Sequence, residues 1–246
     1  RIGIDVLPPD VNESFAGFGV VGTEKKIRWG LVAVKNVGEE VAHAIVNERK
    51  AHGAYADISD FISRVSSKHI NRKSLESLIK AGAFDRFGER GLLLANVDAI
   101  LRAHKQVQRD AHTQQGNLFD LAPNLSMGHV TMRSAPPSSR LACLGWEKEL
   151  LGIYITEHPF ITFAERLITF LVHLCDIDGK SDGAFVKIGG VVEAVRTIVT
   201  KKGELMAFVR FEDGRGACEA VFFPRAFAEY KNFLTEGSLC VVSGKV

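Results

Sequence analysis

Two aspartates separated by a single residue, Asp176 and Asp178, have a spacing at which carboxylates can hold metal ions for phosphoryl transfer. They stand in the segment CDIDGKSDG, which has the composition of a turn between domains. No strand pattern places a third carboxylate beside them. We therefore interpret the segment as a surface loop, and we expect neither a metal site nor a catalytic residue there.

Cysteine and histidine also give no pattern typical of catalysis. The cysteines are far apart and form no CxxC or Cys/His pair at metal-ligand spacing, so we expect reduced, structural thiols at Cys143, Cys175, Cys218 and Cys240. His158, in EHPF, has no nucleophile or ligand residue near it in the sequence, and we expect a structural role. These residues indicate no catalytic site, so we look for binding sites.

The first binding candidate is a hairpin at Asn36-Val37-Gly38, with apolar residues at helical spacing on both sides, in IRWGLVAVKNVGEEVAHAIVNERK. This is the layout of a helix-hairpin-helix. Asn36 and Gly38 are residue types that tolerate positive φ, so the hairpin is expected to present backbone N–H groups beside the next helix N-terminus. Such a site favours a DNA phosphate, and Lys35 adds a charge. The alternative is an ordinary turn between packed helices.

A second unit of this kind is predicted directly after the first. Asn71 is the expected N-cap of a helix, and Gly82 is the expected glycine after its C-terminus. The apolar stripe of that helix is Leu75, Leu78 and Ile79. A long helix is then predicted from about Arg90 to about Arg109.

Basic residues gather at the start of the first of these two helices, where the helix dipole also favours phosphate. They are Lys68, His69, Arg72 and Lys73. Alone, such a run is typical of a solvated face. Two helix-hairpin-helix units in tandem favour nucleic acid instead, and we include Lys68, Arg72 and Lys73 among the expected DNA contacts.

From about Phe185 the sequence alternates β-branched and aromatic residues with polar ones. Runs at 185–200, 203–213 and 216–223 are separated by turns at 201–203 and 214–216, and a helix at 224–234 precedes a strand at 238–246. This is the order of an OB-fold, a five-stranded Greek-key barrel whose sheet face and first loop bind single-stranded nucleic acid. A fifth strand is not evident, which indicates a truncated barrel.

Basic residues of this β-rich part are the expected contacts to single-stranded DNA: Arg196, Lys201, Lys202, Arg210 and Arg215. Phe208 or Phe211 would offer a stacking face to a base. Residues i and i+2 share a face of a strand, so we expect most of Phe208, Phe211, Phe222 and Phe223 to pack in the core.

The stretch HTQQGNLFDLAPN places Leu118 and Phe119 side by side in an otherwise polar segment. An extended peptide can gain affinity by burying such apolar anchors in a partner's pocket, while a polar residue fixes its register. The alternative is that both side chains fold back onto their own domain.

Composition limits the remaining classes of function. The 246 residues carry a formal net charge of +2, so nucleic-acid binding must depend on local basic patches. No apolar run reaches the ~20 residues of a membrane span, and no signal peptide is evident, so we expect a cytoplasmic protein without membrane contact. The first 26 residues show no sustained spacing of apolar residues and no initiator Met, which indicates a piece of a longer chain.

The chain resembles the alpha subunit of bacterial DNA polymerase III, the C-family replicative polymerase. Five segments appear in the family's order and together extend over essentially the whole chain: PPDVNESFAGFGV, IRWGLVAVKNVGEE, NRKSLESLIKAGAFD, LGIYITEHPF and VTKKGELMAFVRFEDGRGACEAVFFP. The resemblance is to the C-terminal portion of the family. It implies that the metal-binding palm aspartates lie upstream of Arg1, so that this fragment is inactive alone and holds no cofactor, while Mg²⁺ serves the parent polymerase.

The resemblance also implies partners. Members of the family carry a short peptide that binds the ring-shaped sliding clamp, the beta subunit, with Gln first and a Leu-Phe pair last. Its match is Gln115, Gly116, Asn117, Leu118 and Phe119. Double-stranded DNA, single-stranded DNA and other replicase subunits are the further partners expected.

The expected division of the chain is multidomain α+β. We assign 1–26 to the end of the fingers region, 27–110 to a tandem helix-hairpin-helix domain, 111–140 to the clamp peptide and linker, 141–184 to a connecting α/β segment, and 185–246 to the OB-fold. Two alternatives remain: the OB-fold region of a tRNA synthetase, which leaves the hairpins and QGNLF unexplained, and a DNA repair enzyme, for which no catalytic constellation is seen.

Overall fold

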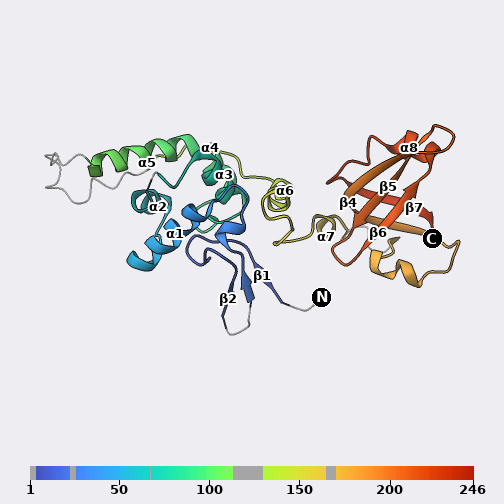
Figure 1. Ribbon diagram of the computed structural model, residues 1–246, viewed down its shortest axis with the longest axis horizontal. Coiled ribbons are helices and arrows are strands. Elements are labelled where there is room, and N and C mark those ends of the chain that lie inside the picture. The colour runs from blue at the N-terminus through green and yellow to red at the C-terminus, as the bar shows by residue number, and fades with distance from the viewer. Residues whose placement is uncertain (1–3, 23–25, 67, 113–129, 165–169) are drawn as a thin grey trace. The chain divides into compact units, whose positions relative to one another are not determined.

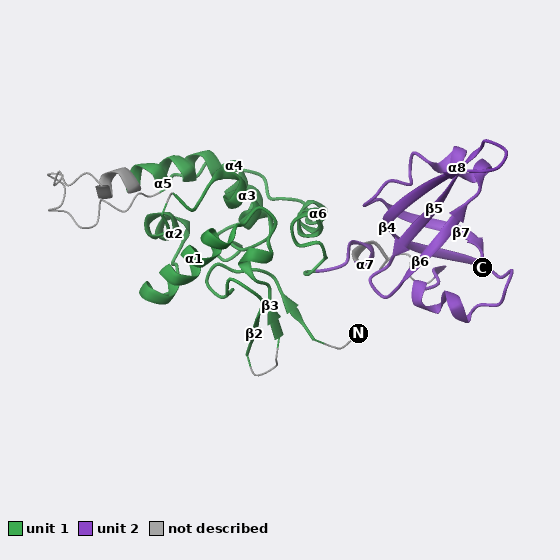
Figure 2. Ribbon diagram, viewed as in Figure 1, with its two compact units in different colours: residues 1–156 green, residues 157–246 purple. Residues whose placement is uncertain are grey.

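The computed structural model describes residues 4–22, 26–66, 68–112, 130–164 and 170–246. The chain divides into two compact units, unit 1 from Arg1 to Thr156 and unit 2 from Glu157 to Val246 (Figure 2). Among the helices of the described residues, none is long and apolar enough to cross a membrane. Each unit is described below by itself.

Unit 1 combines a small sheet with helices (Figure 1). Its strands are β1 (Val6–Leu7), β2 (Gly19–Val21) and β3 (Lys26–Arg28). Its helices are the 3-10 turn η1 (Leu31–Ala33), α1 (Glu39–His52), α2 (Ile58–Arg64), α3 (Arg72–Lys80), α4 (Arg90–Ala95), α5 (Val97–His112) and α6 (Arg140–Leu151). Strand β3 lies between the other two, parallel to β1 and antiparallel to β2.

One apolar core joins the elements of unit 1. It contains residues from near the start of the chain, such as Val11, and from α6, such as Leu151. Aromatic rings form its centre: Phe61 lies between Tyr55 and Phe84, with ring centroids 5.0 and 4.9 Å away and the planes steeply inclined. Edge-to-face packing of this kind adds about 1 kcal/mol per pair beyond burial.

Helix α3 confirms the predicted caps. The side chain of Asn71 accepts a hydrogen bond from the Ser74 amide, and Ser74 Oγ accepts one from the Asn71 amide, which makes a capping box. Gly82 follows the C-terminus with φ of 88°, the left-handed conformation expected of a glycine there. The predicted stripe is fully buried: Leu75, Leu78 and Ile79.

The predicted long helix from Arg90 to Arg109 is wrong in one respect, because it is broken at Asn96 into α4 and α5. The Asn96 side chain donates to the carbonyls of Leu92 and Arg133, at 2.8 and 2.9 Å, and accepts from the Arg133 amide at 2.8 Å. It thereby attaches the segment around residue 133 to the helix pair. The residue at the break thus has a partner 37 residues further along the chain.

Unit 2 is built on an antiparallel sheet of four strands in its described residues, in the order β6-β5-β4-β7. The strands are β4 (Phe185–Val199), β5 (Leu205–Glu212), β6 (Ala217–Phe222) and β7 (Leu239–Lys245). Its helices are α7 (Pro159–Ala164), the 3-10 helix η3 (Leu174–Gly179) and α8 (Pro224–Tyr230). The predicted OB-fold strands and the helix after the third of them are confirmed (Figure 1).

The core of unit 2 lies between one face of this sheet and α8. Val209, Phe211 and Phe222 of the sheet and Phe227 of α8 belong to it. Gly190 allows close approach of β4 to β5, since a Cβ there would lie 2.8 Å from the Glu212 carbonyl oxygen. A register shift between Val192 and Ala194 bends the same strand.

The segment between the predicted linker and the OB-fold is helical where we expected mixed helix and strand signals. Helices α6 and α7 lie in it, and the only β pairing in its described residues is an isolated bridge from Val172 to Ile188. His158 is buried in unit 2, and its Nδ1 accepts from the Phe160 amide at 3.3 Å at the start of α7.

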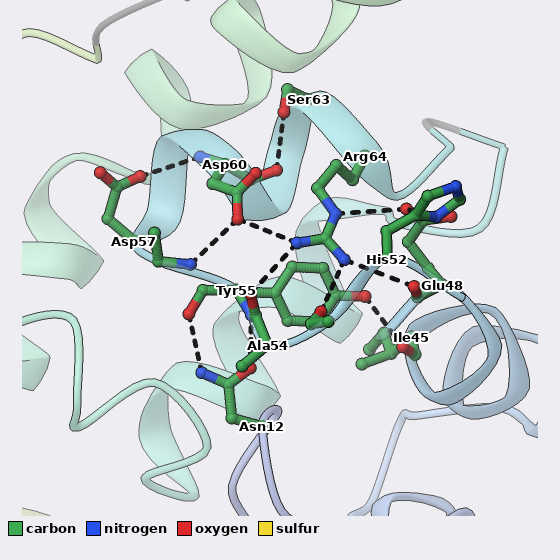
Figure 3. Close-up of polar contacts among 12 residues, drawn as sticks. Asn12, Ile45, Glu48, His52, Ala54, Tyr55, Asp57, Asp60, Ser63 and Arg64 are labelled. Atoms are coloured by element: carbon green, nitrogen blue, oxygen red, sulfur yellow. Dashed lines mark hydrogen bonds and ion pairs between the residues drawn. The ribbon is translucent and has the colours of Figure 1, made fainter. Parts of the chain in front are cut away.

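Arg64 holds the C-terminal end of α1 against α2 in unit 1. Its guanidinium donates to the backbone carbonyls of Gly53 at 2.8 Å and of Glu48 and Ala54 at 3.3 Å. It also pairs with the Glu48 and Asp60 carboxylates and lies 4.5 Å from the centre of the Tyr55 ring (Figure 3). The Gly53 carbonyl stands at the C-cap of α1 and has no partner inside the helix, and the guanidinium supplies its donor.

We predict that Arg64→Met will destabilise unit 1 by about 2 to 3 kcal/mol, because partly buried acceptors lose their donor. Urea unfolding monitored by circular dichroism measures this loss. Arg72→Met is the matched control, because Arg72 also pairs with an acid four residues away but is exposed, and it should cost much less. Equal losses for the two variants would contradict the assignment.

Candidate nucleic-acid interface

The first hairpin runs from Val34 to Gly38, between η1 and α1. Val34 and Val37 are buried in the core, while Lys35, Asn36 and Gly38 are exposed. Asn36 has φ of 69°, which confirms the expected left-handed residue. Its side chain donates to Ser77 Oγ at 3.0 Å, so the hairpin is fastened to α3.

The same expectation is wrong for Gly38, whose φ is −76°. Gly38 is the N-cap of α1 in extended conformation and makes no side-chain cap. A Cβ at this position would meet nothing within 4 Å. The fold therefore does not need glycine here for conformation or space, and the bare backbone leaves the helix N-terminus open to a ligand.

The first-turn amides of α1 have no acceptor inside their own helix and lie at the positive end of its dipole. Lys35 lies on the adjacent turn and adds a positive charge. Glu39 and Glu40, also exposed, occupy the first turn and oppose an anion there. The arrangement can bind a phosphate through backbone donors, with Lys35 offsetting part of the acidic charge.

At the second unit, the structure places Lys68, Arg72 and Lys73 at the N-terminal end of α3, all exposed. Arg72 is bound to Glu76 at 2.7 Å and to Asp98 of α5 at 2.5 Å. Hydrogen bonds to these carboxylates raise the pKa of Arg72. The capping box uses the Ser74 amide, so this helix offers fewer free donors than α1. Asp98 was missed by sequence reasoning, because it lies 26 residues away.

In unit 2, strand register decides which candidates share a face. Arg196 of β4 is paired with Phe208 of β5, and Phe208 with Val221 of β6, so these three lie on one side of the sheet. That side is opposite the core residues Val209 and Phe211, and we call it the outer face. The guanidinium of Arg196 lies 4.7 Å from the centre of the Phe208 ring.

The two aromatic candidates for stacking are thus separated. Phe211 is only 1% exposed and belongs to the core, whereas Phe208 is half-buried on the outer face. The core assignment is wrong for Phe223, which is 67% exposed. Val221 is also exposed on the outer face, where its apolar side chain could contact a ligand. We did not name Val221 as a candidate from the sequence.

The basic residues of unit 2 do not form one patch. Lys201 and Lys202 lie exposed in the turn before β5, and Arg215 lies in the turn after it. A strand of this length spans roughly 25 Å, so the two turns are at opposite ends. Arg210 lies between them and pairs with Glu193 at 2.7 Å.

Arg215 is positioned by a small polar cluster. Its guanidinium lies 3.0 Å from His173 Nε2. The buried Asp213 carboxylate accepts from the amides of Leu174, Arg215 and Gly216 at 3.0, 2.8 and 2.7 Å. Burial alone would raise the pKa of Asp213, but these amides outweigh it and hold the pKa below its usual value.

Two other segments singled out in the sequence remain, the predicted clamp peptide and the Asp176/Asp178 segment, which we expected to be a surface loop without a site. The peptide Gln115 to Phe119 lies outside the described residues and stays a prediction. Asp176 and Asp178 are exposed on η3, a 3-10 helix where we expected a loop. Within the described ranges, no group of three His, Cys, Asp or Glu side chains is arranged to hold a metal ion.

Two families match parts of the chain. Residues 3–92 match a family described as a helix-hairpin-helix motif, and residues 186–246 match one described as an OB-fold nucleic acid binding domain. The first match contains the Asn36 hairpin and α3. The second contains the outer face of the sheet. Both candidate surfaces therefore belong to domain types associated with nucleic-acid binding.

Curated relatives match nearly the whole chain. The DNA polymerase III subunit alpha of Borreliella burgdorferi is 36% identical over 254 aligned residues, which cover 100% of this chain and 22% of that protein. The subunit of Thermus aquaticus is 38% identical, with 92% and 18% covered, and that of Escherichia coli O157:H7 is 31% identical, with 100% and 22% covered. The chain thus spans about a fifth of the length of these relatives, and it belongs to the family of DNA polymerase III alpha subunits.

Proposed function

We propose that this chain is the DNA-binding and clamp-tethering portion of a bacterial replicative DNA polymerase. The observation that carries the proposal is the presence of a helix-hairpin-helix unit and an OB-fold in one chain that matches DNA polymerase III alpha subunits along its length. The parent protein would be the enzyme, a DNA-directed nucleotidyltransferase that uses Mg²⁺. This portion would position DNA without performing the chemistry.

Duplex DNA is assigned to the hairpins of unit 1. The open N-terminus of α1, with Lys35 beside it, would hold a backbone phosphate, and Lys68 and Lys73 would hold others. Such contacts fix the position of a protein on DNA but do not read its sequence. This suits a polymerase, which must move along any template.

Single-stranded template is assigned to the outer face of unit 2. Arg196 stacked on Phe208 combines a charge for the backbone with a ring that a base can stack against. Lys201 and Lys202 would add separate contacts at one end of β5 and Arg215 at the other, with Arg210 between them. The tRNA synthetase and repair-enzyme alternatives leave unexplained why the similarity extends along the whole chain.

The sliding clamp is assigned to Gln115 to Phe119. Burying Leu118 and Phe119 would contribute roughly 1.5 to 3 kcal/mol each before ordering costs. The contact would be weak alone and effective once DNA is bound by the same protein, because the second event is then intramolecular. Other replicase subunits are expected partners of the parent protein.

We predict that Gly38→Ser will weaken duplex binding about tenfold, because the serine side chain would occupy the first-turn amides that a phosphate uses. Serine is a favoured N-cap and a Cβ has open space there, so the melting temperature should not fall. Fluorescence anisotropy with a labelled duplex measures the affinity. Lys35→Gln should lower the salt slope by about 0.9.

The control for this experiment is Lys50→Gln, which removes an exposed charge at the other end of α1. It should leave both affinity and salt slope close to those of the unaltered chain. Unchanged binding by both Gly38→Ser and Lys35→Gln would show that the first hairpin does not contact DNA.

For the clamp, we predict that Leu118→Ala/Phe119→Ala will abolish binding in a titration with a bacterial sliding clamp, because the two apolar anchors are lost. Leu121→Ala, in the same segment but outside the pentapeptide, should bind as the unaltered chain does. Equal affinity of the double variant and the unaltered chain would remove the clamp from the proposed function.

A further inference from the structure

A groove of about 570 Å³ lies on unit 1 between the beginning of α5 and residues 131–133. Arg102 of α5 lines one wall and Arg133 the other, with Asp98 and Thr131 beside them. The size falls in the range of sites that hold a nucleotide-sized group. None of these side chains was among the DNA contacts expected from the sequence.

The walls of the groove are held in place by Asn96, whose side chain is buried. Its amide makes two hydrogen bonds with the backbone of Arg133, at 2.8 and 2.9 Å, and one with the Leu92 carbonyl. The backbone of Arg133 is therefore fixed opposite α5. An arginine attached to a fixed backbone loses less entropy when it binds a ligand than one on a free loop.

The lining of the groove has two basic residues and one acidic residue. Arg102 and Arg133 are exposed, and no carboxylate partner of either is found among the described residues. The one acid of the lining, Asp98, is already paired with Arg72 at 2.5 Å. Most other arginines of unit 1 differ in this respect, since a carboxylate pairs with each of Arg28, Arg64, Arg72, Arg86 and Arg90.

We propose that this groove binds the sugar-phosphate backbone of duplex DNA, with Arg102 and Arg133 on the phosphate oxygens. The planar fork of a guanidinium matches phosphate geometry, and two arginines line the same groove. The inference rests on the proposed function and extends its surface. Through the Arg72–Asp98 pair, the groove adjoins the N-terminal end of α3 with Lys73, so the backbone of one duplex would contact both.

The test compares duplex affinity across a range of salt concentrations for the intact chain and for Arg102→Gln/Arg133→Gln. We expect affinity to fall about tenfold and the salt slope to decrease by about 1 to 2, because one or two phosphates lose their cations. The control Lys50→Gln/Arg225→Gln removes the same charge from exposed residues outside the groove. It should retain the slope, and circular dichroism should confirm that both variants fold.

The outcomes separate this inference from the proposed function. If Gly38→Ser weakens duplex binding and the groove variant does not, the groove proposal fails while the hairpin contact stands. If only the groove variant weakens binding, the groove stands and the hairpin contact fails. If Arg102→Gln/Arg133→Gln keeps its affinity for duplex DNA but loses affinity for a poly-glutamate peptide, the proposal is overturned in favour of a site for acidic peptides.

Discussion

Burial of one apolar core, drawn from residues as distant as Val11 and Leu151, is the constraint on which the rest of unit 1 depends. Val34 and Val37 are fixed in that core, so the residues between and after them must turn outward. The hairpin is exposed because its neighbours are buried. The first-turn amides of α1, directly after the hairpin, then have no acceptor inside their helix, and an anion is favoured there.

Polar contacts set the ends of the elements that this core holds together. Arg64 satisfies carbonyls at the C-terminal end of α1, and Asn36 fastens the other end of the same helix region to Ser77. In unit 2 the constraint is strand register. A slip of one residue would move Phe208 to the core and Phe211 to the surface, so the same pairing that fills the core also creates the outer face.

Local patterns were sufficient for much of this architecture. Residue type and spacing within a few positions predict the cap at Asn71 and the left-handed Asn36. They also predict the order of strands and helix along the chain in unit 2. Contacts between distant residues could not be predicted in this way. Asn96, at the helix break, bonds to the backbone of residue 133, and Arg72 pairs with the distant Asp98 in addition to the nearby Glu76. Neighbours in sequence cannot indicate which carbonyl or carboxylate the fold will bring near.

In the proposed function, the outer face of unit 2 and the hairpin of unit 1 contact different forms of DNA. Amide chemical-shift mapping of the isotope-labelled chain, titrated first with single-stranded and then with duplex DNA, tests it most directly. We expect single-stranded DNA to shift the amide signals of residues around Arg196, Phe208 and Val221, and duplex DNA to shift those around Lys35 and Gly38. Shifts confined to α8 and the core side of the sheet, or one common set for both ligands, would contradict it.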